Sequence, residues 1–200
     1  LQGADLLRSG WRAAYALCRP PGHHAEWGKI GGYCYLNNAV LAAQRLRCLG
    51  RVALLDLDYH HGNGSQQMLR TCPEIAMASL HAAPPQVYPH TSGFASKNAH
   101  NTRFFNHPLP DDCDGQAYHA ALQRALSALC RFRPATLVVS LGFDTAQADP
   151  TGGFCLHPAD YAAFGTALAK QGLPTRFVQE GGYGPAIGDC ATAFVGGFLG

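Results

Sequence analysis

The residues best suited to chemistry follow an apolar run at 52–57 and form an Asp-x-Asp-x-His pattern of Asp56, Asp58 and His60. The run predicts a buried strand, and because side chains alternate faces along a strand, we expect these three groups to project to one side. Neighbouring buried carboxylates are unfavourable unless a cation or hydrogen-bond donors compensate their charge. The pattern therefore predicts a metal site that lacks one ligand. The structural alternative is a pair of hydrogen-bonded carboxylates at a turn.

Asp144 is the expected third ligand of this site, because it follows another apolar run at 136–142. Two carboxylates and one histidine leave at least one open position on a divalent ion, which is typical of a catalytic site. This oxygen-rich set favours zinc, with Fe(II) and Co(II) as alternatives.

Adjacent imidazoles at His23 and His24 lie on a loop that contains proline and glycine. One of them could act as general base toward a water on the ion, while Asp56 or Asn63 holds each ring in one tautomer. Tyr183, presented by a Gly-Gly turn, could donate a hydrogen bond to an oxyanion. Surface histidines and a tyrosine that caps the sheet are the structural alternatives. Together these groups predict metal-assisted hydrolysis of an acyl bond.

Strands must position these groups, and short β-rich runs alternate along the chain with segments of helical period. We expect strands at 13–18, 52–57, 75–80, 136–142 and 175–179, and helices at 36–49, from near Gly64, at 115–132, 158–170 and 189–198. The alternation predicts an α/β fold with a mostly parallel sheet covered by helices on both faces. Ligands of open α/β sheets bind at the carboxyl ends of the strands, which is where these polar groups stand.

The composition favours one ordinary domain and argues against several classes of protein. No linker or repeat divides the 200 residues, of which 47% are hydrophobic. A net charge of +2 with scattered basic residues argues against nucleic-acid binding. No apolar run reaches the roughly 18 residues of a membrane span. The eight cysteines form no Cys-x-x-Cys pair, so a reducing cytoplasm is the expected location.

A series of motifs spans essentially the whole chain: RPPGHHA, GGYCYLNNAVLAA, DLDYHHGNG, SLH, SLGFDT and EGGYG. In this order the motifs resemble the histone deacetylase superfamily. They are most similar to bacterial acetylpolyamine amidohydrolases and class II-type deacetylases. The resemblance implies an arginase-like, three-layer α/β/α fold and a zinc-dependent hydrolase that removes acetyl groups from acetylated amines.

The resemblance also implies roles for individual residues. The zinc ligands would be Asp58, His60 and Asp144. The catalytic residues would be His24 as general base and acid, His23 as its electrostatic partner held by Asp56, Asn63 beside the histidines, and Tyr183 as the group that polarises the substrate carbonyl.

Substrate and cation contacts follow from the same resemblance. The carbonyl of Gly32 would accept the scissile amide N–H, and Tyr33 and Tyr88 would wall a substrate tunnel. A buried, structural K⁺ would be bound by Asp56, by the backbones of Asp58, His60 and Leu80, and by the side chain of Ser79. Thr151 would lie at the rim, where some polyamine-selective members have an acidic residue and many protein deacetylases have leucine. It favours neither substrate class.

We expect acetylpolyamines or other small acetylamines as substrates, acetyl-lysine in proteins as the alternative, and a homodimer as a further partnership. Family members extend before the position of Leu1 and after Gly200, so residues 1–200 are expected to be one incomplete catalytic domain. An inactive member used for binding and an arginase-like binuclear hydrolase are the remaining alternatives. The latter would require a second carboxylate cluster beside Asp56 and Asp58, and the sequence offers none.

Overall fold

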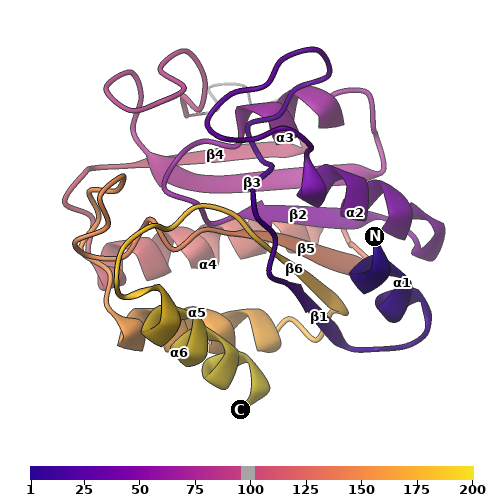
Figure 1. Cartoon of the computed structure of the whole chain (residues 1–200). Coiled ribbons are helices and arrows are strands. Elements are labelled where there is room, and N and C mark those ends of the chain that lie inside the picture. The colour runs from indigo at the N-terminus through magenta and orange to yellow at the C-terminus, as the bar shows by residue number, and fades with distance from the viewer. Residues whose placement is uncertain (96–101) are drawn as a thin grey trace.

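The protein, a computed structural model that describes residues 1–95 and 102–200, has a parallel sheet between two layers of helices (Figure 1). Its strands are β1 (Ala13–Ala16), β2 (Val52–Asp56), β3 (Ile75–Ala82), β4 (Phe104–Leu109), β5 (Thr136–Leu141) and β6 (Thr175–Gln179). Its helices are α1 (Gln2–Arg8), α2 (Asn38–Leu46), α3 (Asn63–Leu69), α4 (Gly115–Arg131), α5 (Pro158–Ala169) and α6 (Ile187–Leu199), with a 3-10 turn η1 (Arg47–Leu49). The strand order is β1-β6-β5-β2-β3-β4, and each neighbouring pair is parallel. The predicted α/β architecture is confirmed.

Strand β2 shows why helices cover both faces of the sheet. All five of its residues are buried. Val52 and Leu54 pack in one hydrophobic cluster with α1, α2 and α3, whereas Ala53 and Leu55 pack in another with α4, α5 and α6. Because successive side chains point to opposite faces, a strand buried on both sides is apolar along most of its length, and here only the last residue, Asp56, is polar.

Two elements, α1 and β4, were not predicted from the sequence. Strand β4 reads FFNHPL, and its polar and proline residues interrupt the apolar pattern expected of a strand. Proline is tolerated there because β4 is the last strand of the sheet, and one of its edges is unpaired among the described residues. Helix α1 has only seven residues, too few for a helical period to stand out.

The expectation that Asp56, Asp58 and His60 project from one strand is wrong. Strand β2 ends at Asp56, and the chain then turns. The Asp56 carboxylate accepts a hydrogen bond from the Asp58 N–H at 3.2 Å, and the Asp58 carboxylate accepts one from the His60 N–H at 2.9 Å. Short carboxylate side chains compete with the ladder for backbone donors. Asp58 and His60 therefore lie on a loop just beyond the strand.

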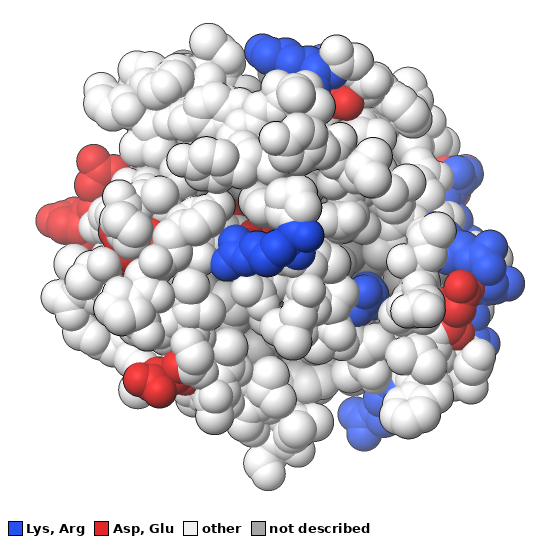
Figure 2. Space-filling view, in the orientation of Figure 1, with Lys and Arg blue, Asp and Glu red and all other residues white. Residues whose placement is uncertain are grey.

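The parallel arrangement brings the carboxyl ends of all strands to one edge of the sheet, so loops from distant parts of the sequence meet there. Charged side chains are scattered among uncharged ones on the face shown in Figure 2. Within the described part of the chain, no helix combines the length and the apolar character needed to cross a bilayer.

Candidate active site

Asp58, His60 and Asp144 converge at this edge, with potential ligand atoms that all lie within 4.8 Å of one another. The His60 Nδ1 atom is 3.0 Å from a carboxylate oxygen of Asp144 and 3.3 Å from one of Asp58. Asp58 follows β2 and Asp144 follows β5, and these two strands are neighbours in the sheet. Sheet pairing therefore places two carboxylates side by side from positions far apart in the sequence.

The three residues fit a divalent cation. Asp58 and Asp144 are fully buried, and burial together with the charge of Asp58 raises the pKa of Asp144 to about 7. Burial lowers the pKa of His60, but hydrogen bonds to both carboxylates outweigh it and raise the value to about 10. The carboxylates thus require positive charge between them. The backbone of Gly181 packs directly against these carboxylates, and no larger residue fits there because a Cβ would lie 2.5 Å from an Asp144 oxygen.

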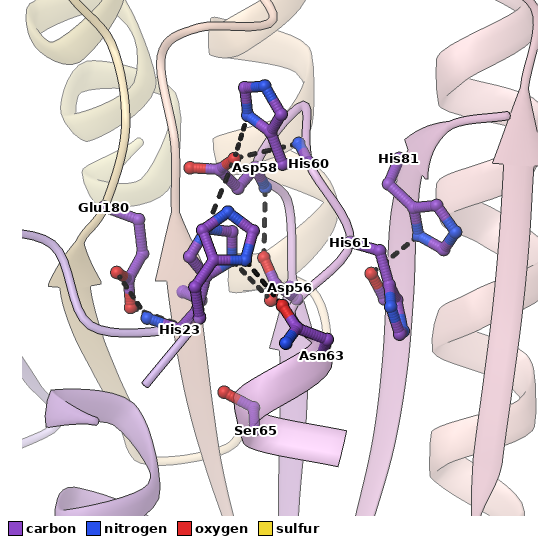
Figure 3. Close-up of polar contacts among 12 residues, drawn as sticks. His23, Asp56, Asp58, His60, His61, Asn63, Ser65, His81 and Glu180 are labelled. Atoms are coloured by element: carbon purple, nitrogen blue, oxygen red, sulfur yellow. Dashed lines mark hydrogen bonds and ion pairs between the residues drawn. The ribbon is translucent and has the colours of Figure 1, made fainter. Parts of the chain in front are cut away.

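The two histidines have contrasting environments, and Figure 3 shows that of His23 beside Asp56 and Asp58. The His23 Nδ1 lies 3.1 Å from a carboxylate oxygen of Asp56, and its Nε2 lies 3.5 Å from one of Asp58. Burial alone would lower the pKa of His23, but these carboxylates raise it well above the ordinary value. His24 instead places its Nδ1 2.7 Å from the amide oxygen of Asn63. Burial and the neighbouring His23 lower the pKa of His24 well below the ordinary value.

Tyr183 lies on a turn that two other loops hold in place. The Asp149 carboxylate accepts hydrogen bonds from the N–H groups of Tyr183 and Gly184 at 2.6 and 2.7 Å. The Arg19 guanidinium donates to the carbonyls of Glu180 and Gly182 and lies 5.2 Å from the centre of the Tyr183 ring. The phenol is thereby fixed relative to the carboxylates.

These groups share one cavity of about 520 Å³. Its lining comprises Pro21, His23, His24, Gly32, Tyr33, Asp58, His60, Tyr88, Asp144, Thr151, Gly181 and Tyr183. The Tyr33 ring centre lies 5.8 Å from that of Tyr183, and the Tyr88 ring meets His24 edge-on with centres 4.7 Å apart. Gly32 must be glycine, because a Cβ there would lie 2.2 Å from the His24 ring.

The remaining predicted site residues lie behind the cavity. Asp56 contacts His23, and Asn63 contacts His24. Ser79 and Leu80 belong to β3, and Ser79 stands beside Asp56 in the register of the sheet. The Ser79 hydroxyl lies 2.8 Å from the His81 Nδ1.

Sequence reasoning gave no role to Glu180, a buried carboxyl group next to the histidine loop. One of its oxygens accepts hydrogen bonds from the N–H groups of Gly22 and His23 at 2.6 and 3.1 Å, and the other accepts one from the Ser140 hydroxyl at 3.0 Å. Burial raises the pKa of Glu180 to about 7. Its place directly after β6 was the signal that could have identified it.

Comparisons with known proteins agree in family and in fold. Residues 1–198 match the histone deacetylase domain. The chain is 42% identical over 194 residues to the acetylpolyamine amidohydrolase of Mycoplana ramosa, covering 94% of this chain and 57% of that protein. It is 43% identical over 206 residues to acetylpolyamine amidohydrolase 2 of Pseudomonas aeruginosa, covering 100% of this chain and 60% of that protein. The chain thus spans less than two thirds of the length of these relatives.

A crystal structure of acetylpolyamine aminohydrolase from Burkholderia pseudomallei superposes with a TM-score of 0.93 at 40% identity. The match covers 98% of this chain and 59% of that one.

Proposed function

Because the chain belongs to the histone deacetylase domain family, as its motifs predicted, we propose that the whole protein is a metal-dependent enzyme that hydrolyses the acetyl-amide bond of acetylated amines. One observation carries this proposal: the three candidate ligands, both histidines and Tyr183 line a single cavity. Two carboxylates and one imidazole favour zinc. An ion held by Asp58, His60 and Asp144 would act as a Lewis acid on a carbonyl and would acidify a water molecule.

His24 is the proposed proton acceptor. Its lowered pKa keeps the ring neutral, and an Nδ1–H donated to Asn63 leaves Nε2 free to take a proton from the attacking water. The same nitrogen then gives a proton to the amine nitrogen as the C–N bond breaks. The products are acetate and the free amine.

Tyr183 and His23 are proposed to stabilise the negative charge that develops on the acetyl oxygen. Burial raises the pKa of the Tyr183 phenol, so the hydroxyl keeps its proton and can donate it in a hydrogen bond. His23 stays positively charged beside Asp56 and Asp58 and supplies a fixed charge to the same cavity.

Gly32, Tyr33 and Tyr88 are the proposed contacts of the substrate chain. The three residues line the cavity, and two aromatic walls suit the slender methylene chain of either a polyamine or a lysine. The Gly32 carbonyl would accept the amide N–H of the substrate. Thr151 lies on the same cavity and carries no charge that would select a polyamine.

The buried carboxylate of Asp56 supports a second, monovalent cation as part of the proposal. Asp56 is fully buried and adjacent to Ser79 across the sheet, and a K⁺ held by these residues with the backbones of Asp58, His60 and Leu80 would compensate its charge. This ion would be structural.

The test is the specificity of the full-length protein, and we expect a higher kcat/KM on acetylputrescine and acetylspermidine than on acetyl-lysine peptides. The amine products and the zinc content would be measured on the same preparation. A ratio that favours the peptides would assign the protein as an acetyl-lysine deacetylase with the same site. Stoichiometric zinc without hydrolysis of any acetylamine would identify an inactive, binding-only member. We expect residues 1–200 alone to be inactive.

A further inference from the structure

Behind His24 a chain of hydrogen bonds leads away from the cavity to a carboxylate. The Asn63 amide oxygen faces the His24 Nδ1 at 2.7 Å, and the Asn63 amide NH₂ donates to Glu26 at 2.7 Å. The second carboxylate oxygen of Glu26 accepts a hydrogen bond from the Gln67 side chain at 2.8 Å. Glu26 does not line the cavity of 520 Å³; it lines a separate hollow of about 280 Å³.

We propose that Glu26 is a positioning residue that fixes the tautomer of His24 by orienting the amide of Asn63, a role that rests on the proposed function of His24 as proton acceptor. An asparagine amide presents an acceptor at one end and a donor at the other, and a flip of the group exchanges them. A carboxylate only accepts. Glu26 therefore draws the NH₂ end toward itself and leaves the oxygen facing the His24 ring.

The orientation of this amide decides which ring nitrogen of His24 carries the proton. With the amide oxygen toward Nδ1, the proton resides on Nδ1, and the lone pair of Nε2 is available to accept a proton from the attacking water. With the amide reversed, its NH₂ would face Nδ1 and favour a proton on Nε2, which could not then accept one from water. His24 can take a proton through Nε2 only in the first arrangement.

Helix α3 holds the carboxylate in position. Asn63 begins this helix, and Gln67 is one turn later on the same face. The Gln67 side chain donates to Glu26 and also accepts from the Trp27 N–H at 3.2 Å. The other ionisable groups that line the hollow with Glu26 are Lys29, His61, Arg70 and Tyr88. Glu26 is partly buried there and contacts Asn63 without lining the cavity that holds His24.

The variant Glu26→Gln tests the proposal, because the new amide can offer a donor to Asn63 and allow it to flip. In the full-length, metal-loaded protein we expect kcat on acetylspermidine to fall about 10- to 100-fold, with KM within about twofold and an unchanged metal content. The double variant Glu26→Gln with Asn63→Asp reverses the polarity of the pair: the introduced carboxylate accepts from both neighbours. It should recover most of the lost kcat.

Gln67→Met separates positioning from simple anchoring of the loop. It removes the side-chain bonds to Glu26 and Trp27 but leaves the bond between Glu26 and Asn63, so a loop anchor would lose at least as much kcat here as in Glu26→Gln. We expect the smaller loss in Gln67→Met. The reverse order, or no recovery in the double variant, would overturn the proposal.

Nitrogen NMR of the His24 ring gives a readout that does not depend on turnover. The parent protein should carry its proton on Nδ1, and Glu26→Gln should shift part of the population to Nε2. An unshifted tautomer in Glu26→Gln would overturn the proposal even if activity fell. If the parent protein hydrolysed no acetylamine, the proposed function would fail while the ring spectrum still decided the role of Glu26.

Discussion

The floor and the rim of the cavity are held in different ways. The floor consists of His23, His24, Asp58 and Asp144, whose exposed fractions do not exceed 4%. The rim is represented by Tyr33, which is 67% exposed. Each floor side chain has a hydrogen-bond partner from another segment of the chain, which restricts its rotation. The rim side chain is limited mainly by ring contacts.

This difference predicts that the floor residues determine the catalytic step and that the rim residues determine substrate binding. A buried charge that loses its partner cannot turn toward water, so changes at the floor should act on metal binding and kcat. An exposed aromatic side chain contributes contact area and little else, so changes at the rim should act on KM.

The largest effect is expected for Asp144→Ala, which removes one carboxylate of the proposed metal site. Metal content and turnover should be lost together, because a histidine and a single carboxylate hold a divalent ion weakly. Elemental analysis and the deacetylase assay on the full-length protein measure both quantities. Asp112→Ala, which removes an exposed carboxylate, is the control and should leave both unchanged. Equal metal content in the two variants would contradict the assignment of the ligands.

Tyr183→Phe should have the next largest effect. It removes only the hydroxyl that we assign to the substrate oxygen, so kcat should fall by about 10²–10³-fold while the metal stays bound. Steady-state kinetics on acetylspermidine, with metal analysis of the same sample, would measure this loss. Near-parent turnover would make Tyr183 a structural tyrosine.

Asp149→Asn should show a smaller effect at the same place, because Asp149 acts on the backbone of the Tyr183 turn. Its carboxylate accepts two short hydrogen bonds from this turn and further ones from the N–H and hydroxyl of Thr151. The asparagine side chain would place an NH₂ donor opposite groups that themselves donate hydrogen bonds. The free energy of unfolding in urea should fall by about 1–3 kcal/mol, and kcat should fall less than in Tyr183→Phe. Asp189→Asn, at an exposed position, is the control.

The sequence predicted the floor residues far better than the residues that hold the catalytic side chains in place. Asp58 and Asp144 could be placed together because the carboxyl ends of parallel strands share one edge, and their strands are recognisable as apolar runs. The exact strand end was not predictable. The carboxylates of Asp56 and Asp58 each accept a hydrogen bond from the backbone N–H two residues later, and these bonds replace the strand ladder.

The contacts that hold Asn63 and Tyr183 join segments far apart in the sequence, and no periodicity marks them. Glu26 contacts Asn63 across 37 positions of sequence, and Asp149 contacts Tyr183 across 34. A loop residue has no fixed face as a strand or helix residue does, so its partner depends on the fold of the whole chain. The roles assigned to these supporting residues remain predictions that the variants above test.

The smallest effects belong to the rim, where Tyr33 combines an exposed ring with a left-handed backbone of φ 65°. Tyr33→Leu and Tyr33→Gly both remove the ring, so each should raise KM by about 2- to 10-fold, the equivalent of 0.5–1.5 kcal/mol, with kcat within about twofold. The two variants should differ in stability. Leucine keeps the unfavourable φ, whereas glycine adopts it without strain, so Tyr33→Gly should be more stable than Tyr33→Leu by about 1 kcal/mol in urea unfolding. A kcat loss as large as that of Tyr183→Phe would show that the rim takes part in the chemistry, and the separation between floor and rim would fail.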